Sequence, residues 1–148
     1  MKKAYLVGHG NGSVEEFIEL LKDKKIETLV DVRSVPYSKF ASQFNRENLS
    51  KQLSEKGINY VYMGEILGGR HPEGFDKYMD SNQFNKGIAI LEEGISSSTS
   101  AIMCSEIDHT KCHRRFIGSK LIDEGFIVED ISKKGVIEKI AQKTLGGF

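Results

Sequence analysis

Residues 4–17 read AYLVGHGNGSVEEF, and this stretch decides the fold because it joins a strand pattern to a helix pattern. The apolar run at 4–7 has the length of a short buried strand, and the glycine-rich loop at 8–12 ends it. Ser13 followed by Glu16 fits a capping box, in which two side chains satisfy free N–H groups at a helix start. Apolar residues then follow at the spacing of one helix face, at Val14, Phe17, Ile18 and Leu21. The stretch therefore predicts a strand followed directly by an amphipathic helix.

The same alternation of strand and helix continues along the chain. Further apolar runs predict strands at residues 28–33, 58–62, 101–104 and 126–128. Helical patterns lie between these runs, at 45–57, around Ile88, Leu91 and Ile95, and at 111–124. Since strands that alternate with helices form parallel sheets, we expect a single α/β domain. Its sheet should be mostly parallel and five-stranded, with helices on both faces.

One domain accounts for the length of 148 residues, and 39% hydrophobic residues supply enough apolar surface for a core. We assign residues 1–131 to this domain. Residues 132–148 form a C-terminal amphipathic segment that packs on the domain or extends from it. The apolar positions of this segment are Val136, Ile140 and Ala141.

Charge and hydropathy exclude several classes of protein. The 21 basic and 21 acidic side chains give a net charge of +0, so any nucleic-acid contact must come from a local patch. The apolar run after Lys2 and Lys3 is too short for a signal peptide, and no stretch approaches the roughly 20 apolar residues of a membrane span. Two cysteines do not make a disulfide framework. We therefore expect a soluble cytoplasmic protein without a membrane partner.

Unusual polar residues follow the predicted strands. Ligands of open parallel sheets bind outside the carboxyl ends of the strands, so these residues are the candidates for a site. His9 lies among three glycines between a strand and a capped helix, where an anion can bind. Arg33 follows Asp31 at the end of a buried strand, and an arginine there suits a phosphate or a carboxylate. Asp31 itself fits a structural salt bridge, and a surface histidine in a turn is the simpler alternative for His9.

The segment CSEIDHTKCHRR at 104–115 carries the two cysteines. Asp108 or Thr110 can cap the helix that follows, which would place Cys112, His113 and Arg114 in its first turn. The helix dipole and neighbouring arginines there favour the ionised form of a thiol. A thiolate nucleophile, a redox pair and an oxyanion site are all compatible with this pattern, and so is a purely structural role for buried cysteines.

The segment also spells Cys104-x4-His109-x2-Cys112-His113, which contains the atoms that zinc prefers. Consecutive side chains on a helix diverge by about 100°, so Cys112 and His113 cannot easily hold one ion. We therefore predict no metal site. The predicted catalytic residues are Cys104, Glu106, Cys112 and His113. The predicted substrate-binding residues are His9, Asn11, Arg33 and Arg114.

Several short motifs together resemble a bacterial and archaeal family catalogued as "domain of unknown function 488". The motifs are Gly8-His9-Gly10-Asn11, Asp31-Val32-Arg33, Leu67-Gly68-Gly69, and Met103-Cys104-x-Glu106 followed by Cys112-His113-Arg114. The resemblance covers about residues 4–131. It implies a compact α/β domain and no particular reaction. The polar residues that the family pattern implies are His9, Asn11, Asp31, Arg33, Cys104, Glu106, Cys112, His113 and Arg114.

Three functions are compatible with the sequence. The favoured one is a small enzyme or ligand-binding protein whose strand-end pocket takes a small anionic ligand or nucleotide. The second is a nucleic-acid accessory domain, with salt-sensitive binding, that uses Arg33, Lys39, Phe40, Arg46, Arg70 and Arg114. The third is a thiol redox or metal sensor built on Cys104 and Cys112. The sequence decides neither whether the protein is an enzyme nor its cofactor or oligomeric state.

Overall fold

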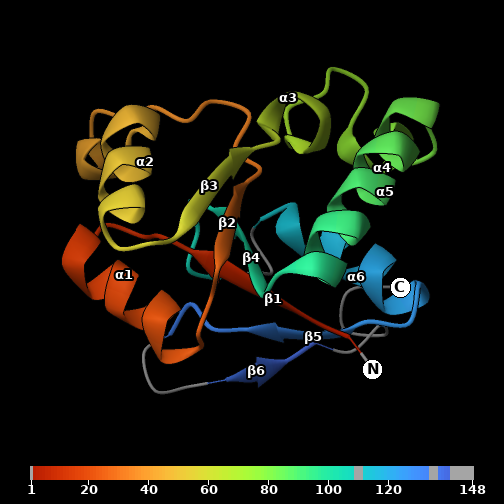
Figure 1. Cartoon of the computed structure of the whole chain (residues 1–148). Helices are drawn as coiled ribbons and strands as arrows, with labels where there is room; N and C mark the ends of the chain where they lie inside the picture. The colour runs from red at the N-terminus through yellow and green to blue at the C-terminus, as the bar shows by residue number, and fades with distance from the viewer. Residues whose placement is uncertain (1, 109–111, 134–136, 141–148) are drawn as a thin grey trace.

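The computed structural model of the chain describes residues 2–108, 112–133 and 137–140 (Figure 1). Its strands are β1 (Lys3–Gly8), β2 (Thr28–Asp31), β3 (Asn59–Tyr62), β4 (Ser100–Cys104), β5 (Ile127–Asp130) and β6 (Glu138–Lys139). Its α-helices are α1 (Val14–Asp23), α2 (Arg46–Glu55), α3 (Gly64–Leu67), α4 (Phe75–Tyr78), α5 (Asn82–Ser97) and α6 (Arg114–Asp123). A short 3-10 helix, η1 (Ser42–Phe44), precedes α2.

The strands form one sheet in the order β3-β2-β4-β1-β5-β6. The pairs from β3 through β5 are all parallel, and β6 pairs antiparallel with β5. The predicted α/β class and the mostly parallel sheet are confirmed. The sheet has six strands where five were predicted, because the two-residue β6 is too short to leave a periodic pattern in the sequence.

Helices cover both faces of the sheet (Figure 1). Alternate residues of a strand face opposite sides, so the central strand β4 divides its apolar residues between two cores. Ala101 and Met103 belong to the core under α1 and α2, and Ile102 and Cys104 belong to the core under α5 and α6. This alternation places the Cys104 side chain on the face of the sheet that α6 covers.

Local signals set the helix starts on the α1 and α2 side. The Ser13 hydroxyl accepts a hydrogen bond from the Glu16 backbone N–H at 3.1 Å, as the capping box predicts. Asn45 precedes α2 as expected, but its side-chain oxygen accepts instead from the backbone N–H of Ser38 at 2.8 Å. Asn45 therefore ties the loop after β2 to the start of α2.

The predicted helix at 111–124 begins later than expected. Helix α6 starts at Arg114, so the placement of Cys112 and His113 in its first turn is wrong. Both residues precede the helix because tertiary contacts hold them: the Cys112 sulfur is bonded to Cys104, and the His113 ring bonds to the Val32 carbonyl. Thr110, the alternative cap, and Lys111 lie outside the described residues.

Part of the C-terminal segment lies against the sheet. Ile140 is buried in the core under α5 and α6, and Glu138 and Lys139 form β6. Val136 and Ala141 lie outside the described residues. Across the described parts of the chain, no helix combines the length and the apolar character needed to cross a membrane.

Candidate functional site

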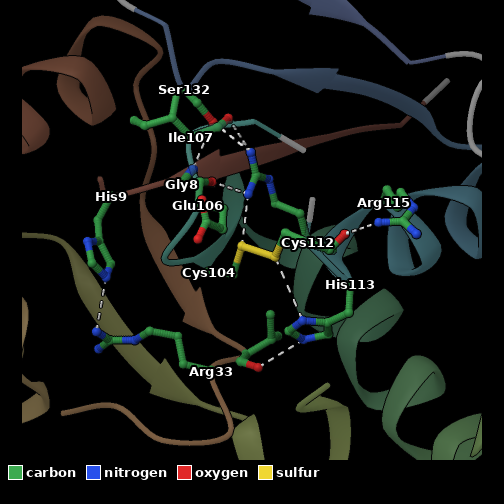
Figure 2. Close-up of a disulfide and its surroundings, with 12 residues drawn as sticks. Gly8, His9, Arg33, Cys104, Glu106, Ile107, Cys112, His113, Arg115 and Ser132 are labelled. Carbon is green, nitrogen blue, oxygen red and sulfur yellow. Dashed lines mark hydrogen bonds between the residues drawn. A yellow bond between two sulfur atoms is a disulfide. The ribbon is translucent and has the colours of Figure 1, made fainter. Parts of the chain in front are cut away.

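The candidate site lies where the strand order reverses. The loop after β1 leads to α1 and the loop after β4 leads to α6, and these two helices cover opposite faces of the sheet. Adjacent parallel strands whose connections diverge in this way leave a crevice at their carboxyl ends. His9, Arg33 and Cys104 stand at the ends of β1, β2 and β4, and Figure 2 shows their side chains around a common space.

A disulfide joins Cys104 to Cys112 within this space. Cys104 closes β4 and is 2% exposed, whereas Cys112 in the loop before α6 is 8% exposed. Both cysteines line a pocket of about 300 Å³, so the sulfur pair is open to a small molecule from that side. Of the roles that the sequence left open for these residues, the redox pair is the one this arrangement suits.

Arg114 is fully buried behind the disulfide. Its Nη1 donates to the Cys104 sulfur at 2.8 Å and to the Glu106 carbonyl, and its Nη2 donates to the Ile107 carbonyl at 2.7 Å. The remaining donors go to Asp130 and Ser132, both at 3.1 Å. Since a guanidinium has five N–H groups, Arg114 has none left for a ligand. Its position suits an arginine that orients the Cys104 sulfur and the loop after β4.

Two residues of this cluster were not among the sequence candidates. Asp130, the last residue of β5, accepts from both the backbone N–H and the hydroxyl of Ser132. The Ser132 hydroxyl also accepts from the Gly8 backbone N–H at 2.8 Å, which links β5 to the end of β1. The signal was present, because Asp130-Ile131-Ser132 repeats the Asp31-Val32-Arg33 pattern of an aspartate at a strand end with a polar residue two positions later.

Arg33 forms the corresponding pair at the end of β2. Its Nε and Nη2 donate to the two Asp31 carboxylate oxygens at 2.9 and 2.8 Å, and Tyr60 donates to the same carboxylate at 2.5 Å. A third Arg33 N–H, on Nη1, contacts His9 Nε2 at 3.3 Å. Among the described residues, the other two of its five N–H groups have no partner, and the side chain lines the pocket. Arg33 can therefore still donate to a ligand.

His9 holds Arg33 in place as a neutral imidazole. Its Nδ1 lies 2.6 Å from the Gly10 carbonyl, which can only accept, so Nδ1 carries the proton and Nε2 accepts from Arg33. Burial, together with the Arg33 charge, lowers the pKa of His9 to about 4. The ring stacks on Phe44 with the centroids 4.4 Å apart. In this arrangement His9 contributes orientation rather than positive charge.

His113 has the same kind of fixed tautomer beside Cys112. Its Nε2 lies 3.1 Å from the Val32 carbonyl and therefore donates, which leaves the Nδ1 lone pair 3.7 Å from the Cys112 sulfur. Burial lowers the pKa of His113, so the ring is neutral near pH 7. A Cβ at Gly69 would lie 2.8 Å from this ring, so glycine allows the close approach. His113 is thus placed to accept a proton from a Cys112 thiol.

The pocket with the disulfide adjoins a second one of about 590 Å³, and the two share Arg33, Val35, Arg70, Ser105 and Glu106. Asn11 is exposed and lines the larger pocket. Seven of the eight predicted site residues line these two pockets, and Arg114 lies behind them. The structure therefore brings the candidates together at one edge of the sheet.

In the described structure, the residues suggested for nucleic-acid binding do not gather at one place, and the described residues suggested for a metal site form no group of ligands. Two of the six residues suggested for nucleic-acid binding, Arg33 and Arg114, are buried, while Lys39 and Phe40 are exposed. Arg46 stacks over the Tyr62 ring at 4.3 Å. His109, which completed the suggested metal spacing, lies outside the described residues. Within the described part, no three His, Cys, Asp or Glu side chains are grouped as metal ligands would be.

Fold and site together define a class: a parallel α/β domain with a cysteine pair at the strand-order reversal of its sheet. The chain belongs to the family described as "Domain of unknown function DUF488", whose model matches residues 13–121. The resemblance inferred from the motifs is confirmed, and the matched range leaves out His9 and Asn11 before it and Asp130 and Ser132 after it. No curated protein and no solved structure matches the chain.

Proposed function

We propose that this protein is a thiol–disulfide exchange domain that binds its substrate in the strand-end pocket. The observation that carries the proposal is the Cys104–Cys112 disulfide, which lines the pocket. A hydrogen-bond donor lies beside one of its sulfurs and a hydrogen-bond acceptor beside the other. Arg114 donates to the Cys104 sulfur, and His113 presents a lone pair to the Cys112 sulfur. A guanidinium stabilises a thiolate more than a neutral sulfur, so Cys104 suits the role of the leaving or resolving thiolate.

The exposure of the two cysteines supports Cys112 as the attacking thiolate. Cys112 is the more exposed of the two cysteine residues, which supports it as the one whose sulfur meets the substrate. In the reduced protein, His113 Nδ1 accepts the Cys112 proton and the thiolate attacks one sulfur of a disulfide RSSR. The RS–SR bond breaks, a Cys112–SR bond forms, and the first RS⁻ takes the proton from His113.

The second step closes the cycle within the protein. The Cys104 thiolate attacks the Cys112 sulfur, the Cys104–Cys112 bond forms, and the second RS⁻ leaves and takes up the proton that Cys104 released. The protein dithiol and RSSR thus become the protein disulfide and two RSH, and the reverse reaction reduces the protein. In this scheme a substrate disulfide is the oxidant and a small thiol is the reductant.

A matched pair of variants tests the assignment. Reduced Cys104→Ser and Cys112→Ser proteins are each treated with the neutral hydroxyethyl disulfide, and intact-mass spectrometry follows the adduct. We expect Cys104→Ser to accumulate a mixed disulfide at Cys112, Cys112→Ser to react much more slowly, and the wild type to reach the internal disulfide without accumulating an adduct. Equal adduct rates in the two variants, or a wild type that never forms the internal disulfide, would overturn the proposal.

His113→Asn examines the proton acceptor separately. In the Cys104→Ser background, which traps the adduct, adding His113→Asn should slow adduct formation at pH 7, and the difference should shrink at pH 9, where solvent hydroxide supplies the thiolate. A deficit that is the same at both pH values would show that His113 only supports the fold.

A further inference from the structure

We infer that the exchange site takes small disulfides and thiols of the α-amino-acid class, in which a carboxylate and an ammonium group flank the sulfur. This inference rests on the proposed exchange function and names its substrate class. It follows from the charged side chains that line both adjoining pockets, which are Arg33, Arg70 and Glu106; Asp108 lines only the larger pocket.

Two arginines form a cationic side of the site. Arg33 is fixed by Asp31 and His9, and two of its N–H groups have no partner in the described part of the chain, which suits recognition of a carboxylate. Arg70 is held next to it, because the Arg70 backbone N–H donates to the Ser34 hydroxyl at 3.0 Å. The Arg70 side chain is exposed and makes no ion pair with another described residue. A ligand carboxylate can therefore meet both guanidinium groups.

Glu106 supplies the opposite charge. The Arg114 guanidinium binds its carbonyl, and a side chain at Gly8 would collide with that carbonyl, so the backbone of Glu106 is tightly held. Figure 2 shows its carboxylate directed into the space between His9, Arg33 and the disulfide. Within the described chain this carboxylate has no ion-pair partner. A ligand ammonium group is the complement of such a carboxylate.

Charges of both signs restrict the ligand. A purely anionic ligand, such as a phosphate, would gain from Arg33 and Arg70 but would be repelled by Glu106. A purely cationic ligand would be attracted by Glu106 but repelled by the two arginines. A zwitterion satisfies both sides, and pockets of about 300 and 590 Å³ fall in the range of small-molecule sites. The geometry therefore favours an amino-acid disulfide over a phosphate or a long peptide.

Four disulfides that differ in charge test the inference: zwitterionic cystine, anionic dithiodipropionate, cationic cystamine and neutral hydroxyethyl disulfide. Formation of the internal disulfide by reduced wild-type protein is timed for each. Each rate is divided by the rate of the same compound with a small dithiol in free solution, which cancels intrinsic reactivity. We expect cystine to be fastest, by about tenfold over the neutral compound, as expected for about 1.4 kcal/mol of added recognition.

Charge-neutralising variants then assign the two sides of the site. Arg70→Gln and Glu106→Gln should each bring the cystine-to-neutral ratio down several-fold. The surface variants Lys86→Gln and Glu93→Gln on α5, matched to them in charge change, should keep the ratio. In Glu106→Gln, the anionic compound should gain relative to cystine because the repulsion is removed.

The outcomes separate the two levels of the proposal. If all four compounds reacted at the same normalised rate, or if the anionic compound matched cystine in the wild type, the amino-acid assignment would be wrong while exchange stood. If none of them produced the internal disulfide, the exchange function itself would be overturned.

Discussion

The Asp31–Arg33 pair and the Asp130–Arg114 pair lie at the same edge of the sheet, on opposite faces of it. Asp31 follows Leu29 on the face covered by α1 and α2, and Asp130 follows Val128 on the face covered by α5 and α6. Each aspartate ends its strand, accepts a backbone N–H from the residue two positions later, and binds a buried guanidinium. The local design is the same in both.

The pairs differ in the acceptors around the guanidinium. All five N–H groups of Arg114 are used, by a sulfur, two carbonyls, a hydroxyl and a carboxylate. Among the described residues Arg33 uses three of its five, and its side chain lines the pocket. The comparison teaches that burial alone does not mark a binding arginine, since the number of N–H groups left unpaired decides what the residue can recognise.

The largest expected effect is on the free energy of unfolding, which should fall more when Arg114 is replaced than when Arg33 is replaced. Arg114→Met removes the only charged partner that Asp130 has among the described residues, and it leaves the carbonyls of Glu106 and Ile107 without their donor. Breaking such a buried pair costs about 3–5 kcal/mol of unfolding free energy. Arg33→Met should cost about 1–3 kcal/mol, because Asp31 keeps the Tyr60 hydroxyl and a backbone N–H.

Urea unfolding of both variants under the same oxidising conditions measures this difference. We call Arg114, whose N–H groups are all paired, the enclosed arginine, and Arg33 the open one. A loss for Arg33→Met as large as that for Arg114→Met would falsify this distinction.

The next largest effect is on the pH dependence of stability. Of the two arginines, Arg33 is the one whose guanidinium contacts a histidine, so acid should weaken its pair more. The pKa of His9 is 6.5 in an unfolded chain and about 4 in the folded protein. As the pH falls, the unfolded chain takes up this proton first, so stability is complete above pH 6.5 and is lost toward pH 4. At 1.36 kcal/mol per unit, the loss is about 3 kcal/mol.

His9→Gln isolates this contribution, since an amide can donate to Gly10 and accept from Arg33 without titrating. Its unfolding free energy should decline less than that of the wild type between pH 6.5 and 4. His113, whose pKa burial also lowers, is present in both proteins and cancels in the difference. Parallel pH curves for the two proteins would contradict the assignment of the slope to His9.

Ser132→Ala examines the network around the enclosed pair. Its hydroxyl donates to Asp130 and accepts from Gly8 and Arg114, so removal leaves two buried donors unpaired. We expect a loss of about 2 kcal/mol, measured by urea unfolding. Ser132→Thr keeps the hydroxyl and serves as the control. A loss in Ser132→Ala no greater than in Ser132→Thr would mean that the hydroxyl is not what holds Arg114.

Much of this arrangement could be predicted from the sequence, because periodicity reports local structure. The five parallel strands, the capped helix after Ser13, and the gathering of the candidate residues at the strand ends all follow from spacing and from the rule for parallel sheets. The start of α6 could not be predicted, because a distant carbonyl, that of Val32, holds His113 outside the helix.

The different roles of the two arginines could not be predicted either. Two of the acceptors that saturate Arg114 are backbone carbonyls of the turn after β4, and every residue has such a carbonyl. A sequence shows which side chains are polar, whereas the number of N–H groups an arginine has left depends on how the turn folds over it. The spare N–H groups of Arg33 and the saturated ones of Arg114 are therefore tertiary properties.

The smallest expected effect comes from the open pair. In Tyr60→Phe the ring is kept and only the hydroxyl that donates to Asp31 at 2.5 Å is lost. Burial, followed by the bond to Asp31, raises the pKa of Tyr60, so the hydroxyl is a donor throughout the usual pH range. Because Asp31 keeps both Arg33 bonds and Tyr60 is only half-buried, water can replace part of the contact, and we expect a loss of about 1 kcal/mol in urea unfolding.

Tyr37→Phe is the matched control, because its hydroxyl also donates to a carboxylate, that of Glu47, but on the exposed surface. Its loss should be smaller than that of Tyr60→Phe, since exposed partners return to water at little cost. If Tyr60→Phe instead cost as much as Ser132→Ala, the Asp31 carboxylate would depend on each donor as strictly as Asp130 does. The distinction between the two pairs would then hold for the two arginines alone and not for the two aspartates.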